Sequence, residues 1–185
     1  PCAGDFEEVV GTKPSSDEEI IHGPSINDPL AARVFKTISE EHIGEMSFFR
    51  VYSGKVNAGD DLRNTTRNNS EKMRQIYFIN GNKRKDAAQL IAGDIGAALK
   101  LKNTHTGDTL SNPKSPILLP EIKYPTSNMS FAIKPKARGD EEKIANGLAV
   151  MHEEDPTFVY KVDPELKQTI ISGQGELHLN IALKQ

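Results

Sequence analysis

The 185-residue sequence predicts a small antiparallel β-barrel followed by an α+β sandwich of the ferredoxin-like type that lacks its last strand. Two observations predict this fold class. From Pro29 to about residue 118, short segments rich in β-branched and aromatic residues alternate with glycine turns, which is typical of a small barrel. Beyond residue 120 the order becomes strand, helix, strand, strand, helix, which is typical of an open antiparallel sheet covered by helices.

The barrel region is expected to contain five short strands, and side-chain alternation indicates their buried faces. In the segment 44–54, Phe49 and Val51 are expected on one face, with Phe48 and Arg50 on the other. Turns are expected at clusters such as NAGDD and HTGDT, since Gly, Asn and Asp suit tight turns. The expected strands are 30–38, 44–54, 72–79, 86–91 and 95–101.

In the α+β region, the first helix has a definable buried face. Ile144, Gly147, Leu148 and Met151 follow the i, i+3, i+4, i+7 spacing of one face, and Asp155-Pro156 ends the helix. The elements expected in this region are strands 127–134, 157–162 and 168–172, and helices 140–154 and 175–184.

The stretch SGQGELHLNI, residues 172–181, joins the last expected strand to the second helix. Gly173 and Gly175 are expected to give the backbone freedom for this turn. A positive φ at Gly175 would make that position intolerant of a β-branched residue. Leu177 and Ile181 are expected to contact the core, and the helix start is expected to be exposed to partners.

Charge is unevenly distributed along the chain, although the formal net charge is only -3. Residues 1–28 hold seven acidic residues, one base and no sustained apolar period, which is typical of a connector. A basic excess follows in the barrel region; it could contact phosphates, and a solvated loop face explains it equally well. Its members are Arg63, Arg67, Lys72, Arg74, Lys83, Arg84 and Lys85.

Several classes of protein and site are not expected. No apolar run approaches the roughly 20 residues of a membrane span, and the acidic start does not resemble a signal peptide, so we expect a cytoplasmic chain without a membrane partner. The single cysteine, Cys2, can form neither an internal disulfide nor a thiolate zinc site. Glu176 and His178 are two residues apart, which places them on different helix faces, so we expect no metal there. No catalytic arrangement and no cofactor are expected in this chain.

Four motifs carry a family resemblance. In order and spacing they resemble the second and third domains of bacterial elongation factor G, the ribosomal translocase, from about residue 28 to residue 185. The resemblance implies a translation-factor β-barrel at 29–118, a truncated third domain at 121–185, and at 1–28 the linker remnant of a GTPase domain that this chain does not include. The motifs are RVYSGKVNAGD (50–60), AGDIGAALKLKNTHTGDTL (92–110), EEDPTF (153–158) and TIISGQGELHLNI (169–181).

The resemblance implies a function for the intact protein. Such a factor binds the ribosome, chiefly small-subunit rRNA and protein, and couples GTP hydrolysis in its GTPase domain to tRNA and mRNA translocation. GTP and Mg are expected in that domain, because the phosphate-binding loop G-x-x-x-x-G-K-[ST] does not occur in the 185 residues. The stretch NGNKRKD has Lys85 where a guanine-reading motif needs Asp, and it is expected to be a hairpin loop. This chain is therefore not expected to be an enzyme.

The resemblance also implies docking residues. In the family, the turn before the second helix faces the GTPase switch regions and the small ribosomal subunit, and the fusidic-acid pocket lies at that junction. Gly175, Glu176 and His178 are the positions that correspond to this docking surface. Gln174 departs from the family, which commonly has Met there.

Two alternatives stay open at this point. One is a ribosomal-protection protein that releases tetracycline, or a ribosome-recycling paralogue, which would share both domains. The other, of a different class, is a free-standing RNA-binding or adaptor module outside translation. An upstream gene sequence encoding a phosphate-binding loop would eliminate the second alternative.

Overall fold

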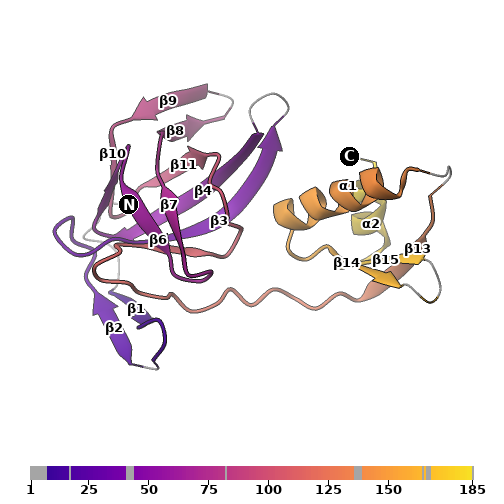
Figure 1. Ribbon diagram of the computed structural model, residues 1–185, viewed down its shortest axis with the longest axis horizontal. Coiled ribbons are helices and arrows are strands. Elements are labelled where there is room, and N and C mark those ends of the chain that lie inside the picture. The colour runs from indigo at the N-terminus through magenta and orange to yellow at the C-terminus, as the bar shows by residue number, and fades with distance from the viewer. Residues whose placement is uncertain are drawn as a thin grey trace. The chain divides into compact units, whose positions relative to one another are not determined.

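The computed structural model describes residues 8–16, 18–40, 44–81, 83–135, 139–163, 165 and 168–184. The chain divides into two compact units, Pro1–Ile122 and Lys123–Gln185 (Figure 1). The limits expected from the sequence, 118 and 121, lie just before this division. The first unit is the β-barrel with a β-hairpin before it, and the second is the α+β unit.

The first unit is antiparallel throughout the strands that the structure describes. Its main sheet has the strand order β7-β6-β12-β3-β4-β11-β8-β9, and two small sheets pair β1 with β2 and β5 with β10. The strands are β1 (Val9–Thr12), β2 (Glu19–His22), β3 (Ala31–Glu40), β4 (Gly44–Ser53), β5 (Lys55–Asn57), β6 (Asp61–Asn64), β7 (Asn69–Lys72), β8 (Ile76–Asn80), β9 (Lys83–Ala87), β10 (Gln89–Ile91), β11 (Ile95–Leu99) and β12 (Thr109–Ser111).

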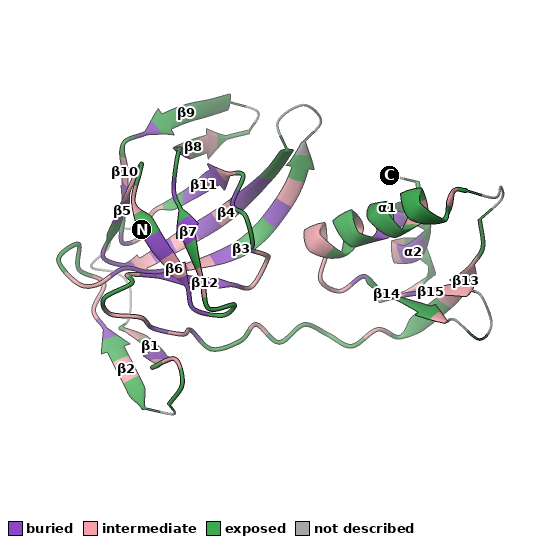
Figure 2. Ribbon diagram, in the orientation of Figure 1, coloured by how far each residue is buried: buried purple, intermediate pink, exposed green. Residues whose placement is uncertain are grey.

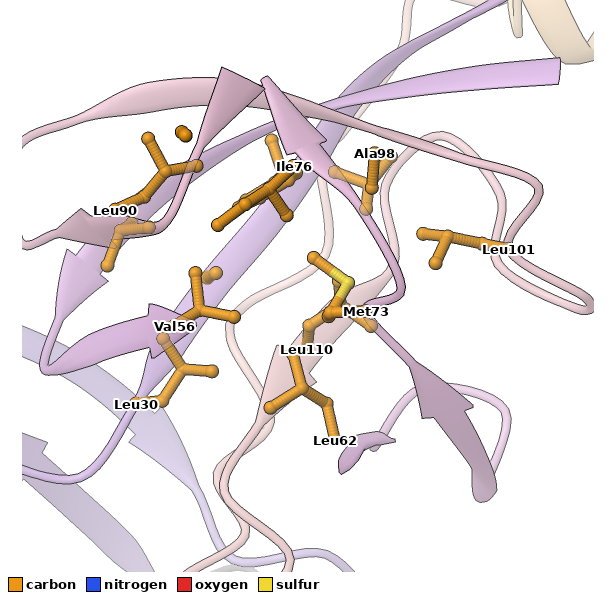
Figure 3. Packing of buried hydrophobic residues seen from close by; sticks show 14 residues of the cluster. Leu30, Val56, Leu62, Met73, Ile76, Leu90, Ala98, Leu101 and Leu110 are labelled. Atoms are coloured by element: carbon orange, nitrogen blue, oxygen red, sulfur yellow. The ribbon is translucent and has the colours of Figure 1, made fainter. Parts of the chain in front are cut away.

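The barrel core is built from the inward side chains of these strands. In β4, Phe49 and Val51 are buried, whereas Phe48 and Arg50 on the other face are half-buried. This agrees with the predicted alternation of side chains along this strand. Figure 3 shows how leucine, isoleucine, valine and methionine side chains from the strands and from the segments between them point toward one another. Burying such side chains contributes about 1.5–3 kcal/mol each, so this cluster is the main stabilising feature of the barrel.

The predicted strand 72–79 is wrong, because the structure breaks it into β7 and β8. Met73 lies between them with a fully buried side chain. Its N–H donates to the carbonyl of Asp60 at 2.9 Å, and its carbonyl accepts from the N–H of Gly59, so it pairs with the β5–β6 turn instead of a strand. The predicted strand 86–91 is likewise divided, between β9 and β10.

The expected hairpin loop NGNKRKD is mostly strand. Its residues from Lys83 onward form β9, which pairs with β8 in the register Asn80↔Lys83 and Phe78↔Lys85. Gly81, with φ 57, lies in the turn, and Asn82 is outside the described residues. The basic side chains therefore stand on an edge strand that is exposed over most of its length (Figure 2).

The segment 1–28, expected to be a plain connector, contains the β1–β2 hairpin. Val9 pairs with His22 and Thr12 with Glu19, and Thr12 also bridges to Leu118 after the barrel. At Gly11 a side-chain carbon would lie 2.6 Å from Cγ1 of Ile117, so this position allows the hairpin to approach closely. The hairpin is thus part of the barrel unit. Residues 1–7 are outside the described residues.

The second unit is a three-stranded antiparallel sheet with two helices. The sheet order is β13-β15-β14, and the core contains Leu148, Phe158, Ile171 and Leu179. The fold expected from the sequence is confirmed here, with most element limits shifted by one or two residues. The elements are β13 (Met129–Ile133), α1 (Glu141–Glu154), β14 (Val159–Asp163), β15 (Gln168–Gly173) and α2 (Glu176–Ala182).

The two helices are confirmed, but some of the residues predicted on their buried faces are exposed. In α2, Leu177 is 73% exposed and Ile181 50% exposed, while Leu179 and Ala182 are buried. In α1, Leu148 is buried but Gly147 is exposed. In each helix the side that faces the sheet is narrower than the apolar pattern indicated.

Candidate functional site

The turn between β15 and α2 depends on a glycine at Gly173. A side-chain carbon there would lie 2.7 Å from Nδ1 of His178 and 2.9 Å from Cδ2 of Leu179. Both distances are below van der Waals contact, so only glycine lets the helix return this closely to the strand. Gly175 has φ 173, an extended backbone that any residue adopts, and a side-chain carbon there would meet no atom within 4 Å. The positive φ considered for Gly175 is therefore wrong.

His178 is held inside the unit by both ring nitrogens. Nδ1 accepts a hydrogen bond from the N–H of Gln174 at 3.1 Å, and Nε2 lies 3.0 Å from Oδ2 of Asp155. Because Nδ1 accepts, the proton of the neutral ring is on Nε2, which donates to the carboxylate. The ring also meets the buried Phe158 edge-on, with centroids 6.4 Å apart. His178 thus connects the β15–α2 turn to the end of α1.

Asp155 is the anchor of this connection. Its Oδ1 accepts from both the N–H and the hydroxyl of Thr157, at 2.8 and 2.6 Å, which shapes the turn from α1 into β14. Burial raises the pKa of Asp155, but the hydrogen bonds from Thr157 and the interaction with His178 outweigh it and hold the pKa below its ordinary value. Asp155 is therefore a charged acceptor at neutral pH.

The arrangement is one of positioning, not of catalysis. Both nitrogens of His178 are engaged within the chain, so neither is free to take a proton from a substrate. The Gln174 amide adds a second tie, because its Nε2 donates to the carbonyls of Pro125 and Thr126, each at 3.2 Å. At the helix start Glu176 and Leu177 are exposed. Of the three expected docking residues, Glu176 is exposed, Gly175 is half-buried, and His178 supports the turn from within.

The expected RNA-binding residues fall into two groups. Arg74 and the β9 residues Lys83, Arg84 and Lys85 have exposed side chains. Among the other three, the Arg63 guanidinium donates to the Asn68 amide oxygen, and the ammonium of the exposed Lys72 lies 3.9 Å from the Asp61 carboxylate. Because both side chains of the Lys72–Asp61 pair are exposed, this pair contributes little to the stability of the barrel.

Arg67 is part of the barrel framework. Its Nε donates to Oδ2 of Asp108 at 2.8 Å, and the Asp108 side chain is only 4% exposed. The same oxygen accepts from the side-chain amide of Asn64 at 2.8 Å and from the N–H of His105 at 2.9 Å. Arg67 therefore compensates a buried carboxylate that organises a loop of the barrel.

Comparison with known proteins assigns the two units. A profile described as elongation factor G domain 2 matches residues 29–113, and one described as Elongation Factor G, domain III matches residues 124–185. The chain carries domains 2 and 3 of the elongation factor G family. A crystal structure of a Thermus thermophilus protein matches with a TM-score of 0.73 and 28% identity, over 83% of this chain and 23% of that one. The chain thus spans about a quarter of that protein's length.

Sequence reasoning missed two residues that hold the turn of this elongation-factor-G-like chain. Asp155 and Gln174 lie in two of the motifs, but the sequence alone gives neither of them a role in holding the turn. The DPT sequence was a local signal for the Asp155 turn. Its contact with His178, 23 residues away, has no signal in the spacing.

The described part of the chain has neither a cluster of metal-ligating side chains nor a helix suited to span a membrane. Among those residues, no three His, Cys, Asp or Glu side chains gather as a metal site would require. None of the helices described is both long enough and apolar enough to cross a membrane.

Proposed function

We propose that the chain is the ribosome-docking and coupling part of a translational GTPase that moves tRNA and mRNA through the ribosome in the cytoplasm. The observation that carries this proposal is the pair of elongation factor G matches, in domain order, at 29–113 and 124–185. In the intact protein, GTP and Mg bind and react in a GTPase domain of the same polypeptide. In this proposal the two domains transmit the effect of GTP hydrolysis to the ribosome and do not themselves catalyse the reaction.

The β15–α2 turn is the proposed contact with the GTPase domain. Its backbone is fixed from two sides, by His178 on Asp155 and by Gln174 on the carbonyls before β13. A rigid turn suits a coupling element, because a push on the exposed Glu176 would move the whole helix and sheet instead of deforming a loop. His178 acts in this proposal as a positioning residue.

The proposed contact with small-subunit RNA is the β8–β9 hairpin. Lys85 lies directly across from Phe78, which is 39% exposed, and Lys83 follows on the same side. An aromatic ring beside lysines suits RNA, since bases stack on the ring while ammonium groups meet phosphates.

The docking proposal is tested in the full-length factor with Glu176→Ala. We expect ribosome-stimulated GTP hydrolysis and translocation to slow about fivefold, as for loss of one interface contact, while stability changes by less than about 0.5 kcal/mol. The matched control is Glu165→Ala, an exposed glutamate between β14 and β15. His178→Ala should instead lower the thermal stability of the α+β unit.

Equal effects of Glu176→Ala and Glu165→Ala would contradict the docking assignment. A full-length factor that splits ribosomes or releases tetracycline but does not translocate would contradict the translocase role and favour a paralogue.

A further inference from the structure

A cavity of about 600 Å³ that is open to solvent on one side lies between α1 and the sheet of the second unit. Its walls are mainly apolar and include Ile133, Ile144, Leu148, Tyr160 and Val162. The volume is within the range of roughly 300–1,000 Å³ that is usual for small-molecule sites. The described residues that line the cavity all belong to the α+β unit.

The cavity exists because α1 covers the sheet unevenly. Ile133 and Val162 both pair with Thr169, so they lie in one row on the side of the sheet that carries the core. Yet Val162 is 58% exposed, whereas Leu148, in the middle of α1, is 4% exposed. The helix therefore seals the sheet at its middle and leaves a valine on the core side uncovered near its first turn.

A further strand of this sheet would not fill the space. The sheet order is β13-β15-β14, and Val162 belongs to β14. A strand added along the outer edge of β13 would lie at the sheet edge opposite β14. Such a strand would therefore leave Val162 uncovered.

The charged side chains at the rim of the cavity indicate which sign of charge a ligand would carry. Of the described residues that line the cavity, two are carboxylates, Glu141 and Glu142, and none is a base. The Glu141 carboxylate accepts the N–H of Gly139 at 2.8 Å, which holds it at the helix start. Lys143 follows on the helix, but its ammonium is 3.7 Å from Asp140. The helix dipole offsets only part of the charge of these two carboxylates, so an anionic ligand would be repelled and a cation attracted.

We propose that this cavity binds a small amphipathic cation. Its apolar body lies against Ile144, Tyr160 and Val162, and its ammonium group pairs with Glu141 and Glu142. This inference goes beyond the proposed function and does not depend on it, because the site involves neither the β15–α2 turn nor the basic hairpin.

The test uses phenylbutylamine and phenylbutyrate, which share an apolar body and carry opposite charges at neutral pH. Calorimetric titration of the 185-residue chain should show saturable binding of the amine, with a Kd of roughly 0.1 to 1 mM for so small a ligand. Phenylbutyrate should not bind measurably. Equal binding of the two, or no saturable binding of the amine, would overturn the proposal.

Three variants locate the site. Ala145→Trp fills the cavity and should abolish binding of the amine, whereas Ala149→Trp, one turn further along α1 and outside the lining, should leave it unchanged. Glu141→Gln combined with Glu142→Gln should weaken binding about fivefold, as expected for partly exposed charge pairs. Persistent binding in a folded Ala145→Trp variant would overturn the location.

A measurement on the wild-type chain covers the case in which Ala145→Trp does not fold. Methyl resonances of Ile133, Ile144 and Val162 should shift with amine concentration, while those of Val56 and Leu110 in the barrel core should not. Uniform small shifts over both sets would show non-specific adsorption and overturn the proposal.

Discussion

At Gly173 the absence of a side chain lets α2 pack against the strand that precedes it. Gly173→Ala would place a methyl group 2.7 Å from the His178 ring, and the displacement should cost about 1–3 kcal/mol of unfolding free energy. At Gly175 the backbone is extended and a methyl group would meet no atom within 4 Å, so Gly175→Ala should change the unfolding free energy by less than about 0.5 kcal/mol. Urea unfolding followed by helical circular dichroism measures both, because the described helices lie in the α+β unit.

The pair of substitutions separates close packing from backbone conformation. If Gly175→Ala destabilised the unit as much as Gly173→Ala, flexibility of the turn would matter more than the approach of the helix. If neither did, the contact of His178 with this turn would be looser than the structure indicates.

Among single helices and strands, the sequence predicts best those elements that have one strongly buried face. The strand at β4 was predicted correctly because Phe49 and Val51 alternate with half-buried side chains. The β1–β2 hairpin was missed because its strands are short and only partly buried, and because it pairs with a segment more than 100 residues later in the sequence. Local periodicity does not contain that information.

The wrong face of α2 has a related cause. Apolar residues occupy positions 177, 179, 181, 182 and 183, so they surround most of the helix. Two buried faces fit this pattern, and the tertiary structure selects the one through Leu179 and Ala182. The turn residues of the candidate site were predictable as a cluster because they are adjacent in sequence, but the partner of His178 was not, because Asp155 belongs to another element.

The β8–β9 hairpin can be tested as one element. Lys83→Glu with Lys85→Glu in the full-length factor should weaken small-subunit binding about tenfold or more and reduce the dependence of affinity on salt by roughly one to two counterions. Folding should be little affected, because both side chains are exposed on the edge strand. Filter binding over a series of salt concentrations measures the affinity.

A matched control uses two other exposed lysines of the same unit, Lys55→Glu with Lys114→Glu. If this control weakened binding equally, the effect would be one of net charge and the hairpin would not be a specific contact. Arg67→Glu does not serve as a test of RNA binding, since it would leave Asp108 buried beside a second negative charge.

At the scale of the whole molecule, the chain consists of two units with separate cores. The barrel core consists of residues of the first unit, and the second cluster lies in the α+β unit. Pro120 and Pro125 lie in the segment between the units, which contains no strand or helix from 120 to 128. Proline restricts the backbone conformations of such a connecting segment.

The last prediction concerns nucleotide binding by the chain as a whole. No G-x-x-x-x-G-K-[ST] sequence occurs in the 185 residues, and such loops supply the backbone N–H groups and the lysine that hold nucleotide phosphates. Calorimetric titration with GTP or GDP and Mg should therefore give no saturable heat at micromolar concentrations. The full-length factor, titrated in parallel, should bind both nucleotides. Saturable micromolar binding to the 185-residue chain would show that part of the nucleotide site lies in these two domains, and the division between a catalytic domain and a coupling part would have to be abandoned.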